Sequence, residues 1–361
     1  MTKRINIGGV TVGGGAPVRV QSMTTTPTVD VRSTVEQIVR LAEAGCEIVR
    51  VAVRDEADAR AIRTLRDHSP VPIVADIHFS ADLAVLAVEN GADKIRINPG
   101  NIGGEAAVRR VAECVRSHGI PVRVGANTGS IEQEYLQKYG RTARALVESA
   151  LLDVSRLEKY GVEDIVISVK ASSVPVTVEA YRMLAKRTNY PLHLGVTEAG
   201  TAENGIVKSS IGIGALLLDN IGDTIRVSLT DDPLEEVIAA KRILRACGLE
   251  KDYVEVISCP TCGRCEWDCM GLARRVERAV FGIRKPLKIA VMGCVVNGPG
   301  EARDCDIGIA GGRGKCVLFR RGEAVQTVRA EDAETVFLSA VHACLEENGR
   351  SWHEEDTKED D

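Results

Sequence analysis

The sequence predicts a (β/α)8 TIM barrel followed by a small α+β domain. Three observations indicate this fold: short apolar, β-branched segments alternate with helical patterns from Val18 to Thr230, eight such segments are present, and polar residues gather where they end. Eight buried strands separated by helices over about 250 residues are typical of this barrel. An open, doubly wound sheet is the alternative, but no Gly-x-Gly-x-x-Gly motif follows the first strand to favour it.

The expected strands of the barrel are short runs rich in valine and isoleucine. They are Val18–Met23, Glu47–Val53, Val71–Ile77, Lys94–Asn98, Pro121–Ala126, Asp164–Val169, Pro191–Val196 and Thr224–Leu229. Between them, apolar residues recur at helical spacing, for example from Val35 to Ala42 and from Ala81 to Glu89. After the last strand, Asp231-Asp232-Pro233 is a good helix start, and the helix pattern continues from Leu234 to Ala246.

A short polar linker from Glu250 to Tyr253 separates the barrel from the second domain. We expect the barrel to occupy residues 1–250, the second domain residues 251–350, and an acidic, disordered tail residues 351–361. The expected elements of the second domain are strands at Val254–Ser258, Leu287–Met292, near Ile307 and at Val317–Phe319, and helices at Trp267–Val280 and Ala330–Leu345.

The composition is that of an ordinary soluble protein, with 44% hydrophobic and 27% charged residues. A net charge of -5 gives no general reason to expect nucleic acid as a partner. No apolar run approaches the roughly 20 residues that span a bilayer, and the N-terminus has no apolar signal core. We therefore expect a cytoplasmic protein with no membrane attachment. Eleven cysteines, odd in number and clustered after residue 247, indicate metal binding or catalysis rather than disulfides.

The ends of the expected strands are unusually polar. They carry Arg50 and Arg54, Asp76 and His78, Arg96 and Asn98, Arg123 and Asn127, Ser168 and Lys170, Thr197 and Glu198, and Arg226 and Ser228. A buried arginine costs free energy unless it is paired or faces a ligand, and some of these could pair with Asp76, Glu198 or Asp219. Pairing does not explain arginines on so many successive strands. A ring of arginine and lysine suits a small, highly anionic ligand such as a diphosphate.

A cluster of cysteines occupies the second domain. Cys259-Pro260-Thr261-Cys262 forms a tight turn, and Cys294 follows on a later loop within Gly293–Glu301. These thiols can converge on one metal centre. Cys259, Cys262, Cys265 and Cys269 also have the C-x2-C-x2-C-x3-C spacing of a bacterial ferredoxin, although Met270 stands where that pattern has proline. A tetrahedral zinc site is a third possibility, so spacing alone leaves the ligands open.

Two segments, Cys259–Cys262 and Gly293–Ala302, resemble the signature segments of the 4-hydroxy-3-methylbut-2-enyl diphosphate synthase family. Four barrel segments resemble the same family: Ala75–Phe79, Ile95–Asn101, Gly195–Gly200 and Arg226–Thr230. The resemblance extends from about Arg19 to about Gly312. It implies a [4Fe-4S] cluster whose ligands are Cys259, Cys262, Cys294 and Glu301. On this interpretation Cys265 and Cys269 are not ligands.

The resemblance also implies the reaction and its partners. The family opens the ring of 2-C-methyl-D-erythritol 2,4-cyclodiphosphate by reduction and eliminates water, which gives 4-hydroxy-3-methylbut-2-enyl diphosphate for isoprenoid biosynthesis. Flavodoxin or ferredoxin supplies two electrons, and the family forms homodimers whose active sites lie between chains. The implied substrate-binding residues are Arg50, Arg96, Arg123, Lys170, Arg226 and Ser228, supported by His78, Asn127 and Thr197.

Two carboxylates have implied catalytic roles. Glu301 is a harder, more exchangeable ligand of iron than a thiolate, so it can give up its place to substrate. Glu198, at a strand end, is the candidate acid for the departing hydroxyl, which requires burial near the bound diphosphate to raise its pKa. The alternative function is a barrel that binds a phosphorylated ligand, joined to a structural zinc module or to an electron-transfer ferredoxin domain.

Overall fold

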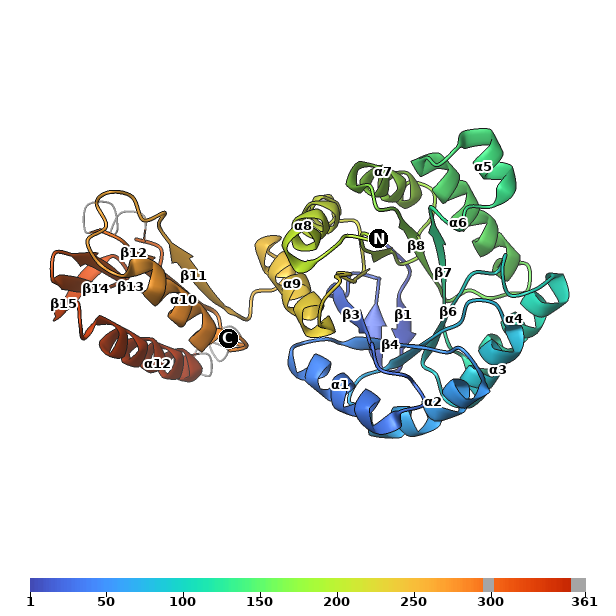
Figure 1. Cartoon of the computed structure of the whole chain (residues 1–361), viewed down its shortest axis with the longest axis horizontal. Helices are drawn as coiled ribbons and strands as arrows, with labels where there is room; N and C mark the ends of the chain where they lie inside the picture. Colours follow the sequence, from blue (N-terminus) through green and yellow to red (C-terminus); the bar gives the residue numbers. More distant parts are fainter. Residues whose placement is uncertain (295–301, 352–361) are drawn as a thin grey trace, which may run out of the picture. The chain divides into compact units, whose positions relative to one another are not determined.

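The computed structural model describes residues 1–294 and 302–351. The chain divides into two compact units, Met1–Leu249 and Glu250–Asp361 (Figure 1). Glu301 and the residues from 352 onwards, on which the expectation of a disordered tail falls, lie outside the described residues. No helix in the described part of the chain is long and apolar enough to cross a bilayer.

The first unit is built on eight parallel strands. They are β3 (Arg19–Met23), β4 (Ile48–Ala52), β5 (Ile73–Asp76), β6 (Lys94–Ile97), β7 (Val122–Asn127), β8 (Ile165–Lys170), β9 (His193–Leu194) and β10 (Thr224–Ile225). Their order in the sheet is β8-β7-β6-β5-β4-β3-β10-β9. A parallel bridge between Ile167 and Leu192 joins β8 to the start of β9 and closes the barrel. The predicted TIM barrel is confirmed, and the open-sheet alternative is wrong.

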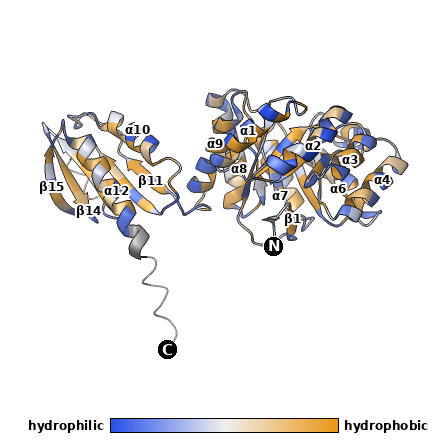
Figure 2. Cartoon of the chain, turned by 90° about the horizontal axis from the view of Figure 1, so that it is seen from below, coloured by the Kyte–Doolittle hydropathy of each residue, from blue (hydrophilic) through white to orange (hydrophobic). Residues whose placement is uncertain are grey.

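Helices surround the barrel (Figure 1). They are α1 (Val31–Glu43), α2 (Glu56–His68), α3 (Ala81–Glu89), α4 (Glu105–His118), α5 (Gln133–Tyr139), α6 (Ala143–Glu158), α7 (Val174–Ala185), α8 (Ala202–Leu218) and α9 (Pro233–Ala246). Asp30, Asp55, Ser80 and Thr142 begin α1, α2, α3 and α6, where each side chain accepts a hydrogen bond from a backbone N–H of the first turn. The helices carry both hydrophobic and hydrophilic residues (Figure 2). This mixture is expected when one face of each helix packs on the sheet and the other faces solvent.

An N-terminal hairpin closes one end of the barrel. Its strands, β1 (Ile5–Ile7) and β2 (Val10–Val12), pair antiparallel through Gly8 and Gly9, which have positive φ angles of 54° and 96°. Buried apolar side chains of the hairpin pack against the starts of three barrel strands, namely Ile48, Val74 and Val166. In barrels of this class the functional end is the opposite one, where the strands finish.

The second unit is a mixed five-stranded sheet with helices on one face. The strands, in sheet order, are β11 (Val254–Ser258), β12 (Leu287–Met292), β13 (Ile307–Gly312), β14 (Lys315–Arg320) and β15 (Glu323–Arg329). The first three are parallel, and the last two pair antiparallel. α10 (Cys269–Val280) and α12 (Ala333–Ser351) share one apolar core with this sheet. The predicted α+β class is confirmed, although β15 was not among the expected elements.

Candidate active site

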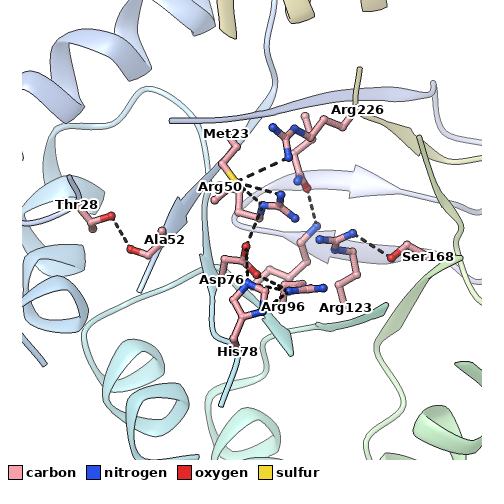
Figure 3. Close-up of polar contacts among 12 residues, drawn as sticks. Met23, Thr28, Arg50, Ala52, Asp76, His78, Arg96, Arg123, Ser168 and Arg226 are labelled. Carbon is pink, nitrogen blue, oxygen red and sulfur yellow. Dashed lines mark hydrogen bonds and ion pairs between the residues drawn. The ribbon is translucent and has the colours of Figure 1, made fainter. Parts of the chain in front are cut away.

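The strand register brings the predicted anion-binding residues together at the carboxyl ends of the barrel strands. Asp76 on β5 lies beside Arg96 on β6, and Arg96 lies beside Arg123 on β7. Because side chains at paired positions of a sheet share a face, all three enter the barrel interior. Figure 3 shows them pointing toward one another together with Arg50 from β4 and Arg226 from the end of β10. We call this end of the barrel the mouth.

Asp76 organises one side of the mouth. Its carboxylate lies 3.1 Å from Arg96 Nη1, 3.6 Å from Arg50 Nε and 3.6 Å from His78 Nε2. Burial alone would raise the pKa of this carboxyl, but the charges of Arg50 and Arg96 and the hydrogen bond from His78 outweigh it and lower the pKa well below its usual range. Asp76 is therefore a permanent anion that holds two arginines and a histidine in place.

Glu236, on α9, organises the other side. It is buried, and its carboxylate lies 3.4 Å from Arg226 Nε while it accepts hydrogen bonds from Leu229 N at 3.0 Å and Ser22 Oγ at 3.2 Å. Met23 fills the space between the two sides, because Arg50 Nη2 lies 3.0 Å and Arg226 Nη1 3.8 Å from its sulfur (Figure 3). Neither residue was predicted from the sequence. A glutamate in an amphipathic helix pattern gives no sign that it binds an arginine of the barrel, and a methionine in a strand gives no sign that it lies between two arginines.

Arg123 and Lys170 of the mouth form no ion pair with a carboxylate among the described residues. Arg123 Nη1 donates to Ser168 Oγ at 3.1 Å, and Lys170 Nζ has no hydrogen-bond or ion-pair partner within residues 1–294 and 302–351. Burial first, and then the neighbouring positive charges, lower the pKa values of both groups. The room for the lysine comes from Gly195, because a Cβ there would lie 2.5 Å from Lys170 Nζ. These groups are left to bind an anion.

The remaining predicted residues lie at the rim or farther away. Asn127, Thr197 and Ser228 are half-buried, and His78 and Glu198 are exposed. Glu198 has a positive φ of 52° and lacks, in this unit, the burial that an acid role requires. Of the alternative partners for the barrel arginines, Asp219 instead binds Arg182 at 2.7 Å. Arg54 lies just before α2 and binds Asp58 at 2.8 Å. Arg50 is therefore the arginine that β4 contributes to the mouth.

In the second unit, two predicted metal ligands follow neighbouring parallel strands. Ser258 at the end of β11 pairs with Val291 of β12, so the loops that carry Cys259 and Cys294 begin at the same edge of the sheet. Gly293 N donates to Cys259 Sγ at 3.0 Å. Hydrogen bonds from the Arg264 backbone and side chain lower the pKa of the Cys262 thiol, which is exposed. Soft sulfur donors that face backbone N–H groups fit an iron–sulfur cluster.

Cys265 and Cys269 lie close to the same loops. A Cβ on Gly293 would be 3.1 Å from Cys265 Sγ and 3.2 Å from Cys259 Sγ. Burial and the neighbouring Cys259 and Cys265 raise the pKa of the Cys269 thiol to about 12, which disfavours the thiolate that binds metal. Among the described residues, no three His, Cys, Asp or Glu side chains are arranged to hold a metal ion, and Glu301 lies outside them.

Comparisons with solved structures reflect the barrel alone. Dihydropteroate synthase of Yersinia pestis matches with a TM-score of 0.50 at 13% identity, over 69% of this chain and 100% of that chain. Type I 3-dehydroquinate dehydratase of Clostridium difficile also matches with a TM-score of 0.50, at 14% identity over 69% of this chain and 97% of that chain. At such identities the likeness concerns the fold and not the chemistry.

Comparisons of sequence cover nearly all of the chain. The family model of the GcpE TIM-barrel domain matches residues 2–241, and that of the GcpE protein C-terminal domain matches residues 255–343. The 4-hydroxy-3-methylbut-2-en-1-yl diphosphate synthase (flavodoxin) of Caldanaerobacter subterraneus subsp. tengcongensis is 56% identical over 96% of this chain and 98% of its own length. The Geobacter sulfurreducens protein of the same name is 52% identical over 96% of this chain and 98% of its own length. The chain therefore belongs to the GcpE family of 4-hydroxy-3-methylbut-2-en-1-yl diphosphate synthases.

Proposed function

We propose that this chain opens the ring of 2-C-methyl-D-erythritol 2,4-cyclodiphosphate by reduction and eliminates water, forming 4-hydroxy-3-methylbut-2-en-1-yl diphosphate in the cytoplasm. Flavodoxin, which the relatives' names include, is the proposed electron donor, with ferredoxin as the alternative. The observation that carries the proposal is the mouth of the barrel. Its cationic side chains outnumber its carboxylates among the described residues, as a site for a doubly charged ligand requires.

Binding of the diphosphate falls to the mouth cations. Arg123 and Lys170 lack carboxylate partners and contact the phosphates directly. Three further arginines are held in fixed orientations by ion pairs, Arg50 and Arg96 by Asp76 and Arg226 by Glu236. The N–H groups that these ion pairs leave free can face the ligand. Because these donors are oriented before the ligand arrives, little side-chain entropy is lost on binding. His78, Asn127, Thr197 and Ser228 contact the ligand from the rim.

Cys259, Cys262, Cys294 and Glu301 are the proposed ligands of a [4Fe-4S] cluster. When bound, such a cluster supplies electrons one at a time and a Lewis-acidic iron. The chain prepares its ligands in two ways. The Gly293 N–H stabilises negative charge on the sulfur of Cys259, and the hydrogen bonds that lower the pKa of Cys262 favour the thiolate that binds metal.

Protonation of the departing hydroxyl is assigned to Glu198. Glu198 is exposed in the barrel unit by itself. It can act as an acid only if another part of the protein covers the mouth and excludes water. We propose that the chain forms a homodimer in which the cluster domain of one subunit covers the barrel mouth of its partner. Under that cover Glu198 would lie beside the bound phosphate and away from bulk water, in position to donate a proton to the departing hydroxyl.

Two variants of the second unit test the proposed ligands. Glu301→Ala should abolish turnover of the cyclodiphosphate under anaerobic conditions while thermal unfolding stays near that of the wild type. Activity close to that of the wild type would instead favour a barrel with a purely structural metal module. The double variant with Cys265→Ser and Cys269→Ser is the matched test, since both thiols are close to Cys259. It should keep its iron and sulfide, and loss of both would overturn the ligand assignment.

A further inference from the structure

A fully buried lysine lies in the barrel interior, on the same face of β6 as Arg96. Lys94 has an exposed fraction of 0%, and its amine donates to the amide oxygen of Gln21, on β3, at 3.3 Å. No described carboxylate forms an ion pair with it. The N-terminal hairpin closes the barrel on the side away from the mouth. Gln21 Nε2 and His193 Nε2 are also buried in this barrel without a hydrogen-bond partner among the described residues.

The charged groups that influence Lys94 are themselves mostly positive. Arg50 on β4 and Arg123 on β7 act on it directly, and His193 on β9, bound to Thr224 through Nδ1, interacts with it electrostatically. The two carboxylates of the mouth are engaged elsewhere, Asp76 with Arg50 and Arg96 and Glu236 with Arg226. A buried ammonium without a counter-ion costs several kcal/mol, so an amine in this position stays uncharged. Burial and the two arginines accordingly lower the pKa of Lys94.

We infer that Lys94 is a charge-regulating residue of the anion site, uncharged in the empty barrel and protonated from solvent when a diphosphate binds in the mouth. The inference depends on the diphosphate site of the proposed function. The step adds one proton to the amine and makes or breaks no bond in the ligand. It occurs because the charges of the ligand offset the repulsion that Arg50 and Arg123 exert on an ammonium.

Such a group lets one site bind two differently charged ligands. In the cyclodiphosphate each phosphorus is esterified and carries one ionised oxygen. Ring opening frees a terminal phosphate, which can carry one further negative charge. A lysine that titrates within the site matches either ligand, whereas a permanently charged one would leave an uncompensated charge in the empty barrel. The affinity for the diphosphate should therefore fall as the pH rises, because the ligand binds together with a proton.

Proton uptake can be measured on the full chain with P1,P2-dimethyl diphosphate, a diester whose charge is constant near neutral pH. Titration calorimetry in two buffers of different ionisation enthalpy gives the number of protons bound with the ligand. The wild type should take up about one proton per ligand near pH 7.5, and Lys94→Met close to none. Lys186→Met, which removes an exposed lysine, is the matched control and should take up as much as the wild type.

A second variant tests the same point without removing the lysine. Gln21→Glu has nearly the same size and places a carboxylate beside Lys94, so the amine is charged before the ligand arrives and uptake should disappear. His193→Gln should keep its uptake. Uptake that is kept in Lys94→Met overturns the inference. The proton then belongs to the histidine if His193→Gln loses the uptake, and to Lys170, whose pKa burial also lowers, if His193→Gln keeps it. Binding without uptake by the wild type refutes only this inference, whereas absence of binding refutes the diphosphate site itself.

Discussion

Replacing Asp76 with asparagine removes the one charge that holds three groups of the mouth. Asparagine has the same size and its amide oxygen can still accept a bond from Arg96, so packing is conserved. Arg50 and Arg96 would, however, remain buried without their counter-charge, with exposed side-chain fractions of only 11% and 10%. The energetic consequence comes from charge and not from a cavity.

Breaking a buried ion pair from one side costs about 3–5 kcal/mol. Total stabilities of about 5–15 kcal/mol leave the Asp76→Asn variant folded but weakened. At about 2–4 °C per kcal/mol for a unit of this size, the melting temperature should fall by roughly 6–20 °C. Because folding lowers the pKa of Asp76, the stabilisation from its charge is complete above the unfolded pKa of about 3.9 and is lost progressively as the pH falls below it. The variant should lack that acidic loss.

Thermal unfolding with and without inorganic pyrophosphate separates this explanation from a general loss of packing. Because a bound anion supplies the missing negative charge, pyrophosphate should raise the melting temperature of Asp76→Asn more than that of the wild type. Asp93→Asn is the matched control, since Asp93 binds Arg66 at 2.8 Å just before β6 begins, at the end of the barrel opposite the mouth. Equal shifts in wild type and Asp76→Asn, or an equal rescue of Asp93→Asn, would show that the missing counter-charge is not the cause of the lost stability.

Two further predictions concern the barrel. Gly195→Ala would place its Cβ 2.5 Å from Lys170 Nζ and 2.7 Å from the backbone oxygen of Arg226, so the lysine amine and the chain at Arg226 must both shift. Calorimetry should give diphosphate binding weaker by at least the roughly 10- to 100-fold that one lost charged hydrogen bond costs, and unchanged affinity would contradict this. Burial raises the pKa of Asp153 to about 6, so the wild type should gain about 3 kcal/mol of stability as the pH falls from about 6 to 4. Asp153→Asn should lack this gain in denaturant titrations, and parallel pH curves would disprove it.

The sequence determined the barrel because its signals are local and repeated. Each strand is a short β-branched run, and residues two apart share a face, so Arg96 and Lys94 had to enter the same interior. Apolar and polar residues also alternate in Ile5–Ile7 and in Val10–Val12, on either side of Gly8-Gly9. Two glycines between such runs are a hairpin signal that could have revealed β1 and β2. The edge strand β15 is mostly exposed and polar, which leaves no such pattern.

The pairing within the site could not be predicted, because it depends on contacts between residues far apart in the chain. Nothing near Glu236 indicates that it accepts a hydrogen bond from Ser22, 214 positions earlier. Likewise, nothing near Lys94 indicates that its amine donates a hydrogen bond to Gln21, 73 positions earlier. The spacing of the cysteines did not select the ligands for another reason, since Cys259, Cys265 and Cys269 lie together in the folded unit. Glu301 lies outside the described residues.

The most direct test of the central claim is anaerobic turnover by the purified chain. Iron, sulfide and zinc are quantified first, and the cyclodiphosphate is then added with a chemical reductant while the allylic diphosphate is followed by phosphorus NMR. We predict about four irons and four sulfides per chain, with product formed in proportion to the electrons supplied. Stoichiometric zinc without sulfide and without product would contradict the account and leave a phosphate-binding barrel joined to a structural metal module.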